Sequence, residues 1–445
     1  MRRFLLSLCC LICLSVVALA QHDHNHDHDG HDHSGHSHAT TDHHGAPAGV
    51  EHSGCIHIDH EGEPYDPTST AFHHIADANV YSIGPWSIPL PCILYAPEKG
   101  LSTFMSSAFN IGHHGSGCQA HDGYVLNEGT VMRVVDSSFP KGEVEIAGFG
   151  HAMIQKDDKE VEKATVVMPD GKSYLLDKKS TLDGGLLGGG ISSFYDFSIT
   201  KNVVSMLLVV AFLFWLFGTA AKGYRTREGQ APKGVQSFME PFFVFIQDEV
   251  AKPFIGPKWE KHLPFLMAIF FFILGLNLFG QIPFLGGANA TGNLAVTMAL
   301  AIFAFLVVNL NGNKHYWEHI LWMPGIPAWV KTIITPVEFL GVFIKPFTLM
   351  LRLFANITAG HIVVLTFVGL IFIFGDKGAF EWGIGREGGS LLGGILAIAL
   401  TLFMMAIELL VAFVQAFVFT ILTASYIGAA VEEHHHDDHA EAHAH

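Results

Sequence analysis

The sequence predicts a polytopic, all-α membrane protein that carries a small exported, β-containing domain at its N-terminus. Half of the 445 residues are hydrophobic and only 15% are charged, which is too apolar for one soluble domain of this size. The apolar residues concentrate after Asn202, in runs long enough to cross a bilayer, which takes roughly 20 residues. The residues before Asn202 are mostly polar. The chain therefore divides into an exported first part and a membrane-embedded second part.

The chain begins with the features of a secretory signal peptide, which we assign to residues 1–20. Arg2 and Arg3 form a basic start, Phe4 to Val17 is an apolar core, and Ala18-Leu19-Ala20 is a small-residue cleavage site. An uncleaved membrane anchor is the alternative interpretation. The signal places the segment that follows it outside the cytoplasm.

Residues 21–60 form a low-complexity segment in which histidine alternates with Asp, Asn, Gly and Ser, and we expect it to be disordered. Two interpretations stay open. The segment is either a tether that holds zinc, copper or nickel, or a solvated linker whose charge changes near pH 6. Beyond metal held adventitiously at these histidines we expect no cofactor. The acidic tail, residues 432–445, is again rich in histidine.

Residues 61–198 read as a small exported domain. Two short apolar runs, Thr165 to Met168 and Ser173 to Leu176, flank Pro169-Asp170-Gly171-Lys172, a pattern that predicts a β-hairpin. Further short runs, Val80 to Ile83 and Ile88 to Tyr95, are separated by prolines. No arrangement of residues in this domain is typical of a catalytic site.

Three cysteines follow the signal peptide, namely Cys55, Cys92 and Cys118. All three lie in the exported part, where a disulfide persists. We expect Cys92 to pair with Cys118, although spacing alone does not fix the pairing. The third cysteine would then be free or bonded to another chain.

The membrane domain, residues 199–431, is expected to contain one N-terminal span, an interfacial helix, a helical hairpin and two long helices. Each long segment is much longer than a single crossing requires; the first has about 43 residues, or about 64 Å of helix, against a hydrocarbon core of about 30 Å. We therefore favour two strongly tilted helices over segments that fold back. The expected bounds are Val203 to Ala220, Gly234 to Pro264, Leu263 to Phe284 with Leu294 to Leu310, Ile333 to Gly375, and Leu391 to Val431.

The loop charges predict the orientation in the membrane. Lysine and arginine follow the first span and reappear before the first long helix, whereas the turn inside the hairpin has neither. Because cytoplasmic loops are enriched in these residues, we expect a multi-pass protein of the bacterial inner membrane with a periplasmic N-terminal domain and a cytoplasmic C-terminus.

Arg352 lies in the middle of the first long apolar segment, within Leu351-Arg352-Leu353-Phe354. A central arginine costs roughly 3 kcal/mol on insertion scales, and it cannot lose its charge because its pKa exceeds about 12. Its presence implies a partner or an aqueous path. A salt bridge inside the helix bundle is the alternative, although few acidic residues lie nearby in sequence.

Other polar residues surround Arg352 on the expected helix. At about 100° per residue, Glu338 and Lys345 share its face, and Asn356 lies one turn beyond it. Alanines at positions 355 and 359 keep this face shallow, so that another helix can approach closely. Together these residues predict a surface that meets a partner helix.

The second long helix and the far end of the first add three more polar groups. Glu408 and Gln415 lie two turns apart on one helical face, and His361 is turned away from Arg352. Histidine exchanges protons near neutral pH. Together with Arg352 and Asn356, these side chains on adjacent apolar helices predict a proton route.

The motif from Leu351 to His361, LRLFANITAGH, resembles the signature of the ATP synthase subunit a family. Matching segments are Thr335 to Glu338, Asn277 to Pro283, and Glu408 with Gln415 to Phe419. The resemblance covers about half of the chain, roughly residues 200–431. His361 and Glu408 fill paired positions at which the family carries both residue types, in an arrangement also seen in mitochondrial members. The exported domain and the histidine-rich segments lie outside the resemblance.

The resemblance implies a proton-channel subunit of a rotary F-type ATP synthase, which is not catalytic alone. In that family two offset half-channels meet a rotating ring of c subunits, and an arginine, here Arg352, separates them. His361, Glu408, Gln415 and Asn356 would line or support the path from the exterior, and Glu338 is the candidate for the cytoplasmic exit. The implied partners are the c-ring, the b subunits of the peripheral stalk, other ATP synthase subunits and membrane lipid.

Several other functions fit the sequence less well. The net charge of −16 argues against nucleic acid as a partner. A histidine-rich metal-ion transporter is the main alternative, but it predicts His/Asp pairs one turn apart within several spans, and the apolar segments lack them. The choice between proton and sodium coupling stays open.

Overall fold

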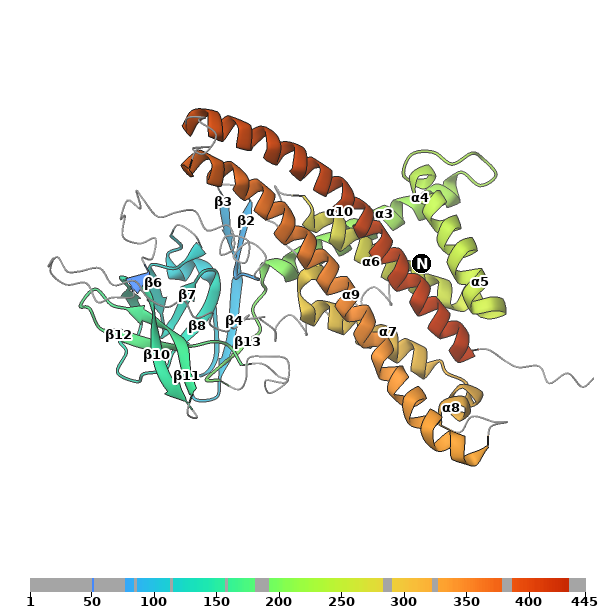
Figure 1. Cartoon of the computed structure of the whole chain (residues 1–445), viewed down its shortest axis with the longest axis horizontal. Helices are drawn as coiled ribbons and strands as arrows, with labels where there is room; N and C mark the ends of the chain where they lie inside the picture. Colours follow the sequence, from blue (N-terminus) through green and yellow to red (C-terminus); the bar gives the residue numbers. More distant parts are fainter. Residues whose placement is uncertain are drawn as a thin grey trace, which may run out of the picture.

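The computed structural model describes residues 50–51, 77–83, 86–112, 115–156, 159–180, 192–282, 290–321, 327–377 and 386–431. The expected signal peptide, nearly all of the histidine-rich segment and the acidic tail lie outside these residues, so the interpretations of them stay predictions. Figure 1 shows a β-rich part, coloured blue to green, beside a bundle of helices coloured green to red.

The β-rich part contains three antiparallel sheets. One has the strand order β1-β10-β11-β12-β8-β7-β6-β9, another is β13-β4-β5, and the third is the β2–β3 hairpin. The strands are β1 Val50–Glu51, β2 Val80–Ile83, β3 Trp86–Pro89, β4 Pro91–Ala96, β5 Gly100–Met105, β6 Gln119–His121, β7 Tyr124–Asn127, β8 Thr130–Val134, β9 Glu143–Glu145, β10 Gly148–Lys156, β11 Lys159–Val167, β12 Ser173–Asp177 and β13 Tyr195–Asp196.

The hairpin expected around Pro169-Asp170-Gly171-Lys172 is confirmed. β11 and β12 pair antiparallel with Val167 opposite Ser173, and Gly171 has a φ of +81°, a conformation that glycine adopts without steric cost. β1 comes from the segment 21–60 that the sequence predicts to be disordered, and it pairs with β10. The sheet therefore begins earlier in the chain than the expected domain, 61–198.

The expected pairing of Cys92 with Cys118 is wrong. Cys92 is a free thiol, fully buried on the inner face of β4 among Leu94, Phe109 and Tyr124. Cys118 is disulfide-bonded, to a cysteine outside the described residues. Spacing suggested the pair, but the strand alternation turns Cys92 into an apolar core. There, burial raises the pKa of Cys92 to about 12.

The helical part begins with α3 (Lys201–Thr226) and continues through α4 (Val235–Phe245), α5 (Lys252–Ile255), α6 (Trp259–Gly280), α7 (Leu294–Leu310), α8 (Lys314–Leu321), α9 (Ala328–Lys377) and α10 (Arg386–Val431). Among the described residues, four helical stretches are long and apolar enough to cross a membrane. α7 is apolar but shorter, with 17 residues. This architecture is consistent with a polytopic helical membrane protein.

The segment expected as one interfacial helix, Gly234 to Pro264, is broken into several pieces. α4 runs into a π-helical turn at Ile246–Ala251, and Lys252-Pro253 opens the short α5. Proline lacks the N–H that would continue the α-helical pattern, which explains the irregular turn before it. Gly256, with φ +69°, then redirects the chain into α6. The structure contains no membrane, so the interfacial placement stays a prediction.

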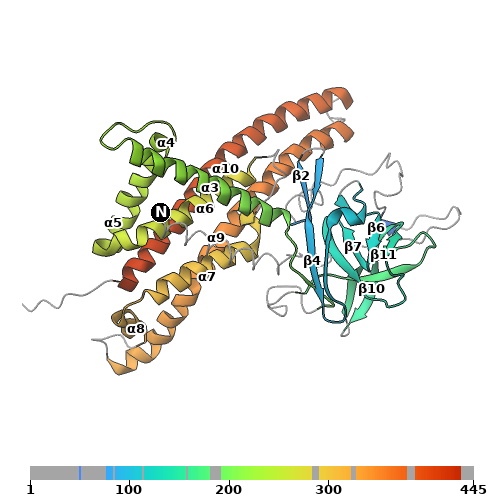
Figure 2. The same ribbon diagram turned by 180° about the vertical axis from the view of Figure 1, so that it is seen from behind.

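α6 lies at the centre of the helical part and packs against α3 on one side and α10 on the other, while α7 packs against α9. The two long helices expected from the sequence are present as α9, with 50 residues, and α10, with 46. They run side by side as an antiparallel pair (Figures 1 and 2). Pro336 and Pro346 lie inside α9 without ending it.

Candidate functional site

Arg352 lies on the outer surface of α9, in a row of residues that other parts of the chain leave uncovered. Arg352, Ala355, Asn356 and Ala359 are all exposed. They recur at intervals of three and four residues, which aligns them along one side of a helix. Because both alanines are small, the surface beside the guanidinium and the Asn356 amide is shallow. It is shaped for close approach of a second helix.

The alternative expected for Arg352, a salt bridge inside the bundle, finds no support in the described part of the chain. No carboxylate there lies within 4 Å of the guanidinium. The arginine instead lies within electrostatic range of the Tyr426 phenol on α10. Its charge therefore faces outward from α9.

Glu408 and Gln415 enter the interface between α10 and α9, where both are buried. Gln415 Nε2 donates to the backbone oxygen of Arg352 at 3.5 Å. The Glu408 carboxyl rests on Gly360, where an added Cβ would lie 3.1 Å from Oε1. Gly360 thus makes room for this carboxyl. The backbone of His361 follows directly in α9; its side chain lies outside the described residues.

Two amides on α6 hold α10 in place behind this interface. Asn277 Nδ2 donates to the Ala412 oxygen at 3.3 Å, and Gln281 Nε2 donates to the Glu408 oxygen at 2.8 Å. The resemblance singled out Asn277 to Pro283 without giving either side chain a role. Both bonds reach carbonyls one turn apart on the face that carries Glu408. They are therefore positioned to fix the height and rotation of Glu408.

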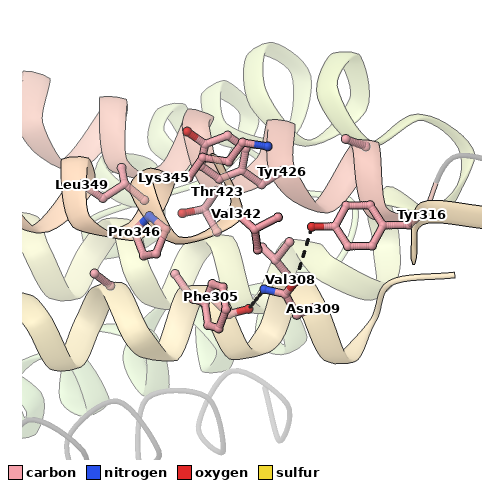
Figure 3. Close-up of a pocket in the computed structure, with 13 residues that line it drawn as sticks. Phe305, Val308, Asn309, Tyr316, Val342, Lys345, Pro346, Leu349, Thr423 and Tyr426 are labelled. Atoms are coloured by element: carbon pink, nitrogen blue, oxygen red, sulfur yellow. Dashed lines mark hydrogen bonds between the residues drawn. The ribbon is translucent and has the colours of Figure 1, made fainter. Parts of the chain in front are cut away.

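A pocket lies between α7, α8, α9 and α10, on the Lys345 side of Arg352 (Figure 3). The Lys345 ammonium lies 5.2 Å from the centroid of the Tyr426 ring. Across the pocket, Tyr316 Oη donates to Asn309 Oδ1 at 3.4 Å. The polar groups among the lining residues are Asn309, Tyr316, Lys345, Thr423 and Tyr426.

Glu338 lies close to the same pocket. It is half-buried on α9, and its carboxyl acts on Tyr316 of α8: burial raises the pKa of Tyr316, and the nearby Glu338 raises it further. The structure thus brings Glu338 and Lys345 to one end of a polar route that continues through Tyr426 to Arg352. Sequence reasoning did not single out Tyr316, Asn309 or Tyr426. Their signal was a polar group within or beside an apolar helix.

Within the described ranges, no group of three or more His, Cys, Asp or Glu side chains is arranged to hold a metal ion. The polar groups of the helical part are instead isolated from one another or bonded to backbone carbonyls. This arrangement gives no observation in favour of a metal-transport site.

The fold and these contacts define a multi-helix membrane protein whose longest helix presents an arginine beside a buried carboxyl interface. A family model described as ATP synthase A chain matches residues 203–428. This covers half of the chain, and the chain belongs to that family.

Curated relatives agree with this result. The chain is 41% identical over 256 residues to ATP synthase subunit a of Chloroherpeton thalassium, covering 56% of this chain and 72% of the relative. It is 38% identical over 278 residues to ATP synthase subunit a of Myxococcus xanthus, covering 60% and 84%. A second family model, described as a domain of unknown function (DUF8433), matches residues 70–147. That match falls inside the β-rich part, for which the first family offers no account.

Proposed function

We propose that this chain is the proton-channel subunit of a bacterial F-type ATP synthase and couples ion flow to rotation of a ring of c subunits. The observation that carries the proposal is the exposed Arg352 on a shallow, otherwise apolar surface of α9, directly beside the buried Glu408 and Gln415. The chain is not catalytic alone and works within the ATP synthase complex. The alternative of a metal-ion transporter is not favoured by the family match.

Arg352 acts in this proposal as an electrostatic divider. A permanent cation favours the ionised form of a carboxyl on the passing c subunit and so lowers its pKa. The proton must leave that carboxyl into one half-channel before the carboxyl reaches Arg352, and another proton is taken up from the second half-channel afterwards. The same charge repels protons and limits direct leakage between the half-channels. Arg352 itself carries no proton.

The path from the exterior would use the interface between α9 and α10. Glu408 and His361 exchange protons along it, while Gln415 and Asn356 support the step towards the c-ring. The bond from Gln415 to the Arg352 carbonyl ties this path to the helix that carries the divider. Asn277 and Gln281 are positioning residues, since they touch only the backbone of α10.

The cytoplasmic exit would use the pocket beside Lys345. Glu338 lies near its Tyr316 wall, and Tyr426 bridges the pocket towards Arg352. This supports Glu338 as the last carboxyl before the cytoplasm. One proton crossing 100 mV supplies about 2.3 kcal/mol, so each ATP requires several such crossings.

The direct test replaces Arg352 by alanine in the assembled complex and measures ATP synthesis driven by a proton gradient in membrane vesicles. We expect a loss of about 100-fold or more, the scale seen when a preorganised charge-stabilising group is removed, with the complex still assembled. Arg225→Ala is the matched control, because Arg225 is an exposed arginine in the last turn of α3. Normal synthesis rates in Arg352→Ala would overturn the proposal.

A further inference from the structure

We propose that the exported β-rich part lies with one sheet face flat on the outer surface of the lipid bilayer. The contact surface, here called the apolar platform, is defined by its large exposed side chains: Trp86, Ile88, Tyr95, Leu101, Met105 and Phe197. The inference requires only that α3 crosses the membrane. It goes beyond proton translocation, in which the β-rich part has no role.

Strand register assigns the platform to one face of the β13–β4–β5 sheet. On β4, Cys92, Leu94 and Ala96 are fully buried on the inner face. Tyr95, on the other face, pairs with Leu101 of β5, and residues opposite one another in an antiparallel pair point the same way. Leu101 is 66% exposed. The sheet therefore has one face in the protein core and one face that the chain leaves uncovered.

No charged residue occupies an outward position on these strands. By alternation from the buried positions, the outward residues are Pro91, Ile93, Tyr95, Leu101, Thr103, Met105, Tyr195, Phe197 and Ile199. An uncovered sheet face in contact with water normally alternates to polar side chains. A continuous apolar face of this kind marks a contact with lipid or with another protein.

The platform is continuous with the start of the first membrane-spanning helix. After β13, the chain still pairs with β4: the Phe197 N–H donates to the Ile93 oxygen at 2.8 Å, and the Ile199 N–H donates to the Pro91 oxygen at 3.2 Å. Ile199, the last outward residue, already packs against the hydrophobic core of the helical part. α3 begins at Lys201. One edge of the sheet therefore sits at the boundary where the chain enters the membrane.

Further contacts fix the β-rich part on α3. The Lys201 N–H donates to the Ala78 oxygen at 2.8 Å, and the Asn202 N–H donates to Asp77 Oδ1 at 3.2 Å. Tyr81 of β2 forms a side-chain hydrogen bond with Ser205, one turn into α3. The β2–β3 hairpin, with Trp86 74% exposed, is thus held beside the first turns of the helix.

The sheet is also turned the right way. In both overall views β4 lies on the side of the β-rich part that faces the helices, and it runs across the direction of α3 (Figures 1 and 2). Its outer face is therefore presented to the plane from which α3 emerges. Trp and Tyr are the residues that concentrate at membrane interfaces. Lipid is present wherever α3 crosses, so a bilayer is the occupant that this geometry favours over a protein partner.

The test uses the whole complex reconstituted in liposomes that contain lipids with a nitroxide on the headgroup. A fluorescent maleimide is attached to Leu101→Cys in one sample and to Met153→Cys in the other. Met153 is the matched control: it is an apolar residue of the same β-rich part, 69% exposed, on β10 and outside the platform. We expect the label at 101 to lose most of its emission to the nitroxide lipids and the label at 153 to keep it.

Equal emission from the two labels in the nitroxide liposomes would overturn the inference. So would a label at 101 that is shielded from a water-soluble quencher but not quenched by the lipids, because that result indicates a protein partner. A triple variant, Trp86→Ser, Leu101→Ser and Phe197→Ser, offers a second readout: the label at Met105→Cys should lose its quenching. ATP synthesis is measured in parallel, so a failed proton-channel assignment and a failed platform give different results.

Discussion

In the helical part, buried side chains donate hydrogen bonds to backbone carbonyls, whereas in the β-rich part they accept hydrogen bonds from backbone N–H groups. Asn277, Gln281 and Gln415 all donate to carbonyl oxygens of a neighbouring helix. In the β-rich part, Ser106 Oγ accepts from the Leu90 N–H and Ser198 Oγ accepts from the Ile93 N–H.

The difference follows from what each kind of secondary structure leaves free. In a helix each interior N–H is already bonded within the helix, and only the second lone pair of each carbonyl remains for a neighbour. At a strand end an N–H can lack a partner, and a hydroxyl satisfies it. Amide side chains are thus the tools for aligning two membrane helices. The candidate site uses them to set the position of Glu408 and Arg352.

The largest effect is expected where the helical part moves a proton. His361→Glu or Glu408→His alone should lower proton-driven ATP synthesis by about 100-fold, the scale of a lost proton-transfer group. The double exchange restores both residue types to the interface and should recover much of the rate. ATP synthesis in inverted vesicles measures all three variants. A double variant no faster than the single variants would contradict direct exchange between the two positions.

A smaller effect is expected from crowding the Glu408 carboxyl. The Cβ of Gly360→Ala would lie 3.1 Å from Oε1, so the carboxyl must shift, and ATP synthesis should fall about tenfold because small misplacements of reacting groups are costly. Gly341→Ala is the matched control: Gly341 lies on the same helix with nothing within 4 Å of an added Cβ. Equal rates in the two variants would show that the position of Glu408 is unimportant.

The comparison itself predicts that losing a side-chain bond costs more in the β-rich part. Ser198→Ala leaves the Ile93 N–H without its partner, at about 1–3 kcal/mol. Gln281→Leu removes a second bond from a carbonyl within a helix, at about 0.6 kcal/mol. Local hydrogen–deuterium exchange in the intact complex measures both, around Ile93 and around Glu408. A larger loss of protection in Gln281→Leu would contradict the explanation given above.

The smallest effect concerns Cys92 and pH. Its pKa is raised to about 12 by burial and by the nearby Asp196 carboxyl, so the folded form holds its proton more tightly than the unfolded form. This contribution to stability is fully present below the ordinary pKa of 9.0 and is lost as the pH rises from there towards 12. A maleimide at pH 8 should modify Cys92 only after denaturation. Rapid labelling of the native protein would contradict the buried placement.

Several parts of the fold could be predicted from the sequence because local patterns determine them. The turn at Gly171 and the apolar runs beside it were sufficient to predict the β11–β12 hairpin. The length of the last two apolar segments, with no polar turn inside either, indicated α9 and α10. The disulfide could not be predicted, because which cysteine faces a core depends on strand register, and register depends on pairing between distant segments.

The candidate site shows the same limit. Arg352, Glu408 and Gln415 stand out because charge and amide groups are costly in apolar helices. That Gly360 accommodates Glu408, and that Asn277 and Gln281 hold α10, depends on how three helices cross. Hydrophobic periodicity is weak in helices that are apolar on every side, so sequence alone does not give those crossings.

The central claim is that Arg352 separates two half-channels rather than carrying protons itself. The direct measurement is passive proton flow through vesicles from which the catalytic sector has been stripped, comparing Arg352→Ala with the unmodified complex. The account predicts faster passive flow in Arg352→Ala together with loss of proton-driven ATP synthesis, because the barrier is removed while the path remains. Passive flow that falls along with ATP synthesis would contradict it and would make Arg352 part of the path.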